Sequence, residues 1–149
     1  MIKHIWTVIC RKSTVDQESN NISLIEVVEQ VTISGKQKSD STEILVPMDF
    51  EIISLWSRDC DGVSVRGTAK IILINPNNEE ITIKEIDIDL TVYKRLRTRI
   101  KFATFGVKYP GRHEFKVFLK NNSEWNEVAN IPVQIDVEPQ KEINAGQSG

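Results

Sequence analysis

Apolar residues recur at every second position through most of the chain, and short polar runs with glycine or proline separate the alternating segments. Successive side chains on a β-strand point to opposite faces, so this period is typical of strands with one buried face. The pattern predicts about eight strands, over residues 4–13, 22–33, 45–57, 68–75, 80–92, 93–102, 112–120 and 126–137. Segment 22–33 also fits a helix, but its β-branched residues and flanking turns favour a strand. Short strands without a helix indicate a β-sandwich or barrel, and we predict an antiparallel sandwich.

The strand predicted over 80–92 changes its apolar parity along its length. Ile81 and Ile83 occupy odd positions, whereas Ile86 and Ile88 occupy even ones. A slip of one residue turns every later side chain to the other face of a sheet. We therefore predict a β-bulge near Lys84–Glu85.

Length and composition fit one folded domain. The chain has 149 residues, of which 40% are hydrophobic and 27% charged. We predict a single domain over 1–137 and a flexible tail over 138–149, which has no apolar cluster. No apolar run approaches the roughly 20 residues of a membrane-spanning helix, and the start lacks a signal-peptide cleavage site. Because the two cysteines, Cys10 in a strand and Cys60 in a loop, form no CxxC motif, these features together predict a cytoplasmic protein.

Three stretches carry a resemblance to a known architecture. "YPGRHEFKVFL" (109–119) and "ANIPVQIDV" (129–137) resemble the last two strands of immunoglobulin-like sandwiches, with a Pro-Gly corner before them. "IWTVICRKSTVDQESNNISLIEVVEQ" (5–30) resembles the start of a small bacterial family of this architecture that has no characterised function. The chain departs from the pattern at Gly111-Arg112-His113, where the commonest members have Gly-x-Tyr, and it lacks the Cys…Trp…Cys spacing of antibody domains. The resemblance implies an immunoglobulin-like β-sandwich and carries no catalytic residues.

The chain lacks the residue patterns of familiar catalytic sites. Its two histidines, His4 and His113, lie in strands far apart in sequence, and no nucleophile elbow accompanies either. The seven glycines form no phosphate-binding loop. We therefore predict a protein that is not an enzyme and uses no cofactor.

The alternative to an interaction protein is a metal- or small-ligand-binding sandwich. In the loop "SRDCDG" (57–62), Asp59 and Asp61 are two residues apart. Two carboxylates and backbone carbonyls in a loop at the end of a sandwich are the start of a C2-like calcium site. Asp and Gly also favour turns, which explains the loop without a ligand. We predict no metal site and keep loop 58–62 as the alternative.

Charge is segregated along the sequence. The net charge is −2 and the pI about 5.7, yet residues 94–120 hold nine Lys or Arg and a single acid. Within that stretch, "YKRLRTRIKF" (93–102) places a base at every second position. We define the basic row as Arg95, Arg97, Arg99 and Lys101.

Two arrangements would weaken the basic row as a binding surface. If strands 80–92 and 93–102 form a hairpin, the row lies beside Glu85, Asp87 and Asp89, and opposite charges compensate each other. In the immunoglobulin-like arrangement, the basic strands belong to different sheets, and the excess charge is divided between two faces.

We predict a non-enzymatic protein-interaction module. Its partner is an unknown protein, or a second copy that pairs through an edge strand. The predicted contact residues are the basic row and Trp125, a candidate exposed aromatic at the turn before the last strand, with loops 34–43 and 58–67 as further contact regions. Nucleic acid is disfavoured by the acidic pI and by the inward-pointing apolar residues between the bases, and nothing predicts membrane binding.

Overall fold

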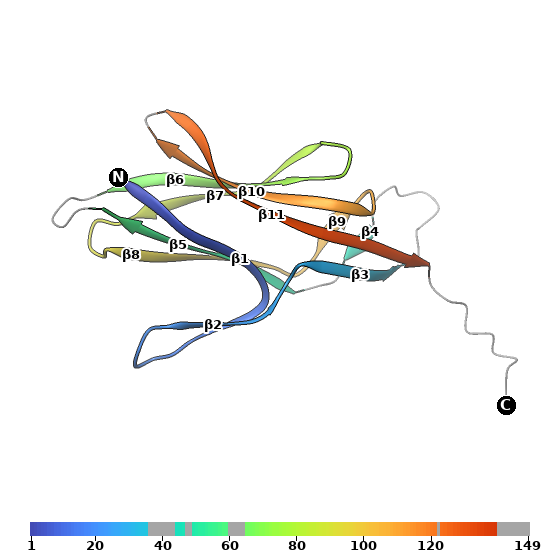
Figure 1. Ribbon diagram of the computed structural model, residues 1–149, viewed down its shortest axis with the longest axis horizontal. Coiled ribbons are helices and arrows are strands. Elements are labelled where there is room, and N and C mark those ends of the chain that lie inside the picture. Colours follow the sequence, from blue (N-terminus) through green and yellow to red (C-terminus); the bar gives the residue numbers. More distant parts are fainter. Residues whose placement is uncertain (36–43, 47–48, 60–64, 122, 140–149) are drawn as a thin grey trace, which may run out of the picture.

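The computed structural model describes residues 1–35, 44–46, 49–59, 65–121 and 123–139 (Figure 1). These residues form eleven β-strands, and no helix among them could span a membrane. The strands are β1 (Ile2–Val15), β2 (Ile22–Val27), β3 (Gln30–Gly35), β4 (Ile44–Val46), β5 (Phe50–Arg58), β6 (Arg66–Ile74), β7 (Glu80–Asp89), β8 (Arg95–Phe102), β9 (Phe105–Val107), β10 (Gly111–Asn121) and β11 (Glu124–Pro139).

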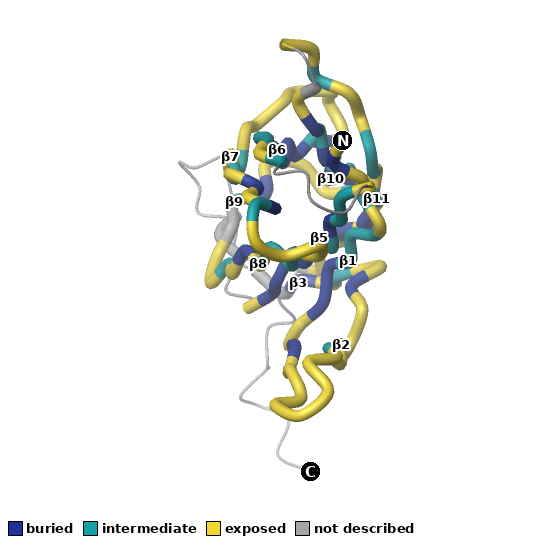
Figure 2. Tube along the Cα trace, turned by 90° about the vertical axis from the view of Figure 1, so that its left-hand side faces the viewer, coloured by how far each residue is buried: buried dark blue, intermediate teal, exposed yellow. Residues whose placement is uncertain are grey.

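Two sheets stacked in layers make up the fold. The first sheet has the strand order β2-β1-β5-β8, and the second has the order β3-β11-β10-β6-β7. Figure 1 shows them one above the other, with the small antiparallel pair of β4 and β9 toward one end. Viewed along the strands, β7 and β8 lie on one side of the molecule and β1 and β11 on the other (Figure 2). The predicted all-β sandwich is confirmed.

The core lies between the two sheets and is built from residues spaced two apart. A single buried cluster contains Phe50, Ile52 and Trp56 of β5 together with Phe115, Val117 and Leu119 of β10. Trp56 is fully buried, and its Nε1–H donates a hydrogen bond to Thr98 Oγ1 on the neighbouring strand at 3.0 Å. A buried indole needs such a partner, so Thr98 fixes the orientation of the largest side chain in the core.

The segment 22–33, predicted as one strand, is two strands in different sheets. β2 pairs with β1 as the predicted hairpin, whereas β3 pairs with β11 in a parallel arrangement. Between them Val28 is buried, and its N–H donates to Ile9 O at 2.8 Å. The chain crosses from one sheet to the other at this point because Val28 enters the core. The sandwich is therefore antiparallel except for the β3–β11 pair.

A β-bulge interrupts the pairing of β6 with β7. Ile71 lies opposite Lys84, whereas the next residue, Ile72, lies opposite Thr82. Ile83 is therefore the extra residue on β7. The predicted bulge is confirmed, one residue before the expected Lys84–Glu85.

Of the two arrangements considered for 80–92 and 93–102, the hairpin does not form. β7 is an edge of the second sheet and β8 is an edge of the first, where it pairs with β5. The connection crosses the sandwich because Leu90 is fully buried and its N–H donates to Val65 O at 2.8 Å. The acids of β7 therefore lie beside β6, and Asp89 pairs with Arg66 at 3.5 Å.

A candidate binding groove beside the basic row

The basic row lies on the outer face of the first sheet, along its β8 edge. Ile100 lies opposite the buried Ile52 and faces the core, so the alternate residues of β8 face outward. Arg97 lies opposite Leu55, and Lys101 lies opposite Glu51. The prediction that the apolar residues of this stretch point inward is thus confirmed for Ile100.

One carboxylate on this face neutralises part of the row. Glu51 is buried, and its oxygens lie 3.7 Å from Arg99 Nε and 3.9 Å from Lys101 Nζ. The hydroxyl of Ser13 donates a 2.5 Å hydrogen bond to the same carboxylate, and Arg99 donates to Ser13 Oγ at 2.7 Å. This cluster joins β1, β5 and β8. Glu85, Asp87 and Asp89 do not compensate the row as a hairpin would have made them do, because those acids belong to the other sheet.

Arg95 and Arg97 have no such compensation. Across the described ranges, no carboxylate lies within ion-pair distance of either guanidinium. Arg97 instead donates to the backbone oxygen of Asn20 at 2.8 Å and to its Oδ1 at 3.0 Å. In the part of the chain that the structure describes, the two positive charges are therefore not balanced by a carboxylate.

The contact with Asn20 shows that the β1–β2 hairpin folds over the outer face of the first sheet. Asn20 is in the turn of that hairpin, and β5 separates β1 from β8 in the strand order. The turn must therefore pass across β5 to meet Arg97. Its shape is set by Asp16, which accepts hydrogen bonds from the N–H and hydroxyl of Ser19 at 2.9 and 2.7 Å, and by a positive φ at Asn20. Those bonds hold the pKa of Asp16 below its usual value.

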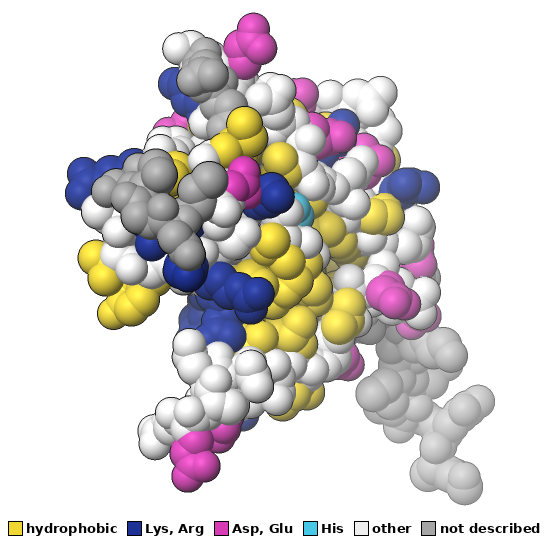
Figure 3. Space-filling view, turned by 60° about the vertical axis from the view of Figure 1, so that its left-hand side comes forward, with side chains coloured by type: hydrophobic (Ala, Val, Ile, Leu, Met, Phe, Trp, Pro, Cys, Tyr) yellow, Lys and Arg dark blue, Asp and Glu magenta, His cyan; other side chains and the backbone are white. Residues whose placement is uncertain are grey.

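A groove of about 830 Å³ lies between this hairpin and the sheet. Its lining combines Trp6, Leu55, Tyr93, Leu96, Ile22 and Leu24 with Arg95, Arg97 and the polar turn residues 19–21. Trp6, Leu55 and Arg97 are cross-strand neighbours on β1, β5 and β8. Tyr93 keeps 70% of its surface exposed. Figure 3 shows Lys and Arg side chains gathered directly beside a hydrophobic surface on this side of the molecule. The groove thus joins an apolar floor to an uncompensated positive charge.

Trp125 lies elsewhere, on the second sheet. The ammonium group of Lys70 lies 4.3 Å from its ring centroid, and that of Lys120 lies 5.6 Å away. These cation–π contacts hold the half-buried indole against its own sheet. The structure therefore does not bring Trp125 together with the basic row.

The alternative metal loop is only partly described. Asp59 forms an ion pair with Lys3 at 3.2 Å, and Asp61 and Cys60 lie outside the described residues. Among the residues with described positions, no group of three His, Cys, Asp or Glu side chains could hold a metal ion.

The histidines are parts of the packing. His113 is buried, and its Nδ1 lies 3.1 Å from the backbone oxygen of Gly111. The ring of His4 meets that of Trp56 edge-on at 5.2 Å, and its Nε2 lies 2.7 Å from Thr7 Oγ1. Burial lowers the pKa of both histidines. Cys10 is a buried free thiol, and burial raises its pKa.

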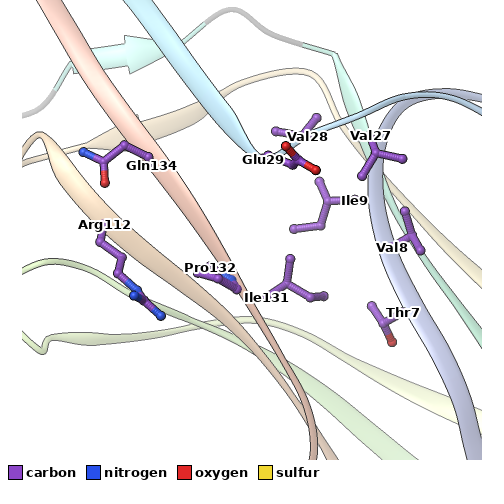
Figure 4. A pocket seen from close by; sticks show the side chains of 10 residues that line it. All are labelled: Thr7, Val8, Ile9, Val27, Val28, Glu29, Arg112, Ile131, Pro132 and Gln134. Carbon is purple, nitrogen blue, oxygen red and sulfur yellow. The ribbon is translucent and has the colours of Figure 1, made fainter.

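A second pocket, of about 490 Å³, opens where the chain passes between the sheets. Figure 4 shows Glu29 next to Val28 and Ile9, with Ile131 near them and Arg112 farther away, beyond Pro132. Its lining contains no histidine, cysteine or serine. The pocket is a mainly apolar opening between the two sheets, with Thr7, Glu29 and Arg112 among the polar residues of its lining.

The sequence did not identify most of the groove. Trp6 and Leu55 are strand residues that the alternation assigns to packing, and only the strand order β1-β5-β8 places them beside Arg97. The polar turn 16–21 is visible in the sequence, but its contact with a residue 77 positions away is not.

Comparisons with known proteins assign no family to the chain. No protein-family model matches the chain, and no curated protein matches its sequence significantly. Among solved structures, it is similar to beta-glucosidase from Listeria innocua in complex with glucose, at 9% identity over 91% of this chain and 16% of that chain, with a TM-score of 0.49. The complex of the same enzyme with isofagomine gives 9% identity, 93% and 16% coverage, and a TM-score of 0.49. The chain thus spans 16% of the length of these enzymes, and at this similarity nothing follows about what it binds.

Proposed function

We propose that the chain is a non-enzymatic protein-interaction module whose groove beside the basic row binds an acidic, partly apolar segment of a protein partner. The observation that carries this proposal is the pair Arg95 and Arg97, which line an apolar groove and have no carboxylate partner in the described part of the chain.

The groove has an apolar floor and a pair of guanidinium groups, and each binds a different kind of chemical group on a partner. Trp6 and Leu55 form an apolar floor, and such surfaces contribute to binding when an apolar side chain removes them from water. The guanidinium groups of Arg95 and Arg97 present forked N–H donors, which bind carboxylates in a bidentate manner. A segment with at least one aliphatic or aromatic side chain next to acidic residues satisfies both.

The groove lies beside an edge strand, and this position also supports the binding of a protein segment. β8 is the last strand of the first sheet, so one side of its backbone is not paired within that sheet. A bound segment that lies along β8 can add backbone hydrogen bonds to the side-chain contacts, as in strand addition.

The setting that we propose is a cytoplasmic, immunoglobulin-like domain. The free, buried thiol of Cys10 fits a reducing compartment. The strand order supports the immunoglobulin-like architecture, since β1, β5 and β8 face a sheet in which β11, β10 and β6 are neighbours.

Selection from a displayed library of random twelve-residue peptides tests the proposal. We expect the wild-type chain to enrich acidic peptides that contain an aromatic or aliphatic residue. Arg95→Glu/Arg97→Glu should lose them, and binding should weaken as salt is raised. The matched control, Arg112→Glu/Lys120→Glu on the second sheet, carries the same change of charge and should retain them. Enrichment that is equal for both double variants, or tight binding of a single-stranded oligonucleotide in place of peptide, would contradict the proposal.

A further inference from the structure

The two sheet edges on one side of the sandwich carry opposite charge. β7 ends the second sheet and β8 ends the first, and both lie on the same side of the molecule (Figure 2). On β7, Glu85, Asp87 and Asp89 lie opposite Lys70, Thr68 and Arg66 of β6. Lys70 contacts the ring of Phe118 on that sheet's outer face, as it does Trp125, so the acids face outward. The basic row faces outward from β8.

Both edge strands, β7 and β8, carry charged side chains that have no ion-pair partner among the described residues of the same chain. Asp89 has Arg66 as a partner, but in the described part of the chain Glu85 and Asp87 have no Lys or Arg within ion-pair distance. Arg95 and Arg97 likewise have no carboxylate. Within the described ranges, two acids on one edge and two bases on the other are thus left without an ion-pair partner.

We infer that these edges bind a second copy of this chain, with β7 of each copy paired to β8 of the other in a two-fold dimer. The two-fold axis runs parallel to the strands and lies beside the edges β7 and β8. Rotation about it places the first sheet of one copy in the same layer as the second sheet of its partner, so that β8 of one copy is next to β7 of the other. Such an interface is isologous, because each copy supplies the same two edges. Both sheets then continue across the dimer, and neither edge stays unpaired.

The direction of the strands fits this pairing. Asp89 and Arg95 lie at the same end of the sandwich, since Asp89 is opposite Arg66 and Arg95 is opposite Ser57. β7 and β8 therefore run antiparallel within one chain, and rotation about an axis parallel to the strands preserves their directions. The paired edges of the dimer are antiparallel as well.

The same rotation sets the register. The rotation does not move any residue along the strand direction. A residue of β7 in one copy therefore comes to lie opposite the residue of β8 in the other copy that is equally far in sequence from Val92, the middle of the connection. This places Asp89 against Arg95, Asp87 against Arg97 and Glu85 against Arg99 of the partner, all on outward faces. Opposite charges directly across an antiparallel pair stabilise it, whereas charges of the same sign on both edges would have kept two copies apart.

Exposed apolar residues lie along the same side. Val92 and Tyr93 in the connection are 76% and 70% exposed, and Ile81 near the start of β7 is 45% exposed. Ile83 of β7 and Phe102 of β8 line a hollow of about 210 Å³ between the two edges. Exposed apolar residues at both ends of β7, with charged side chains between them, supply the apolar and polar groups that an interface combines.

Sedimentation equilibrium with charge-swapped variants tests the inference. We expect the wild-type chain to dimerise with concentration, and we expect Arg95→Glu/Arg97→Glu and Asp87→Lys/Asp89→Lys each to raise the dimer dissociation constant by at least about tenfold. An equimolar mixture of the two variants should recover wild-type affinity, because every reversed edge then faces an edge of opposite charge. That recovery also shows that both variants are folded.

Three outcomes would overturn the dimer: a wild-type chain that stays monomeric at millimolar concentration, an assembly larger than two, or a mixture that does not associate although both variants keep the wild-type circular dichroism. The dimer and the peptide of the proposed function both use Arg95, Arg97 and the edge of β8, so the two compete for this surface, and a variant in the apolar floor of the groove separates them. Leu55→Ser lies in the groove and away from the edge, so it should reduce peptide binding and leave the dimer unchanged.

Discussion

Neutralising the buried carboxylate on the outer face of the first sheet should destabilise the fold. In Glu51→Gln the side-chain oxygen still accepts the hydroxyl of Ser13, so the change removes the charge and keeps the shape. A hydrogen bond to a charged group contributes about 1.5–3 kcal/mol, against about 0.5–1.5 for a neutral one, which puts the loss near 1 kcal/mol. The ion pair with Arg99, whose side chain is 37% exposed, adds about 0.2–1 kcal/mol, and that with Lys101, 70% exposed, adds almost nothing.

The expected loss of unfolding free energy is therefore about 1–2 kcal/mol. Urea unfolding followed by tryptophan fluorescence measures it, with Glu124→Gln as the control at an exposed position. The opposing effect is desolvation, because a neutral amide is easier to bury than a carboxylate. A Glu51→Gln variant as stable as wild type, or more stable, would mean that desolvation outweighs the cluster and would refute the reasoning.

Three further predictions concern the core and one corner. Trp56→Ala should lower the unfolding free energy by about 3–5 kcal/mol in urea, since it leaves a cavity and an unpaired Thr98 hydroxyl. Gly111→Ala should cost about 1–3 kcal/mol by the same assay, because φ there is +132° and a Cβ would lie 3.1 Å from Pro76 Cγ. Burial lowers the pKa of His4 and His113. Their contribution to the free energy of unfolding is therefore fully present above the pKa of histidine in the unfolded chain, near 6.5, and is lost as the pH falls below it. Thermal melts at pH 7.5 and 5.5 should show this loss, and His113→Gln should reduce it; a wild-type melting temperature that does not change with pH would contradict the assignment.

The strands could be predicted from the sequence because alternation is a local property. Phe50, Ile52 and Trp56 share a face simply because they are two residues apart on a strand. The split of 22–33 was not visible, since its apolar residues continue through Val28 without a turn signal. The crossing to the second sheet depends on the burial of that one valine between the layers.

The order of the strands in the two sheets could not be predicted from the alternation of apolar and polar residues. A connection of five residues, 90–94, fits a hairpin as well as a crossing, and the choice is made by the burial of Leu90. That choice decides the candidate site. It separates the basic row from the acids of β7, places Glu51 beside Arg99, and leaves Arg95 and Arg97 over the groove.

The most direct test of the proposed binding surface is an NMR titration that follows the indole N–H signals of the three tryptophans. Trp6 lines the groove, Trp56 is in the core and Trp125 lies on the second sheet. The titrant is a synthetic ten-residue peptide of alternating glutamate and leucine around one phenylalanine. We predict that it shifts the Trp6 signal and leaves those of Trp56 and Trp125 in place. A titration that moves Trp125 and not Trp6, or that moves none of the three at millimolar peptide, would contradict the account.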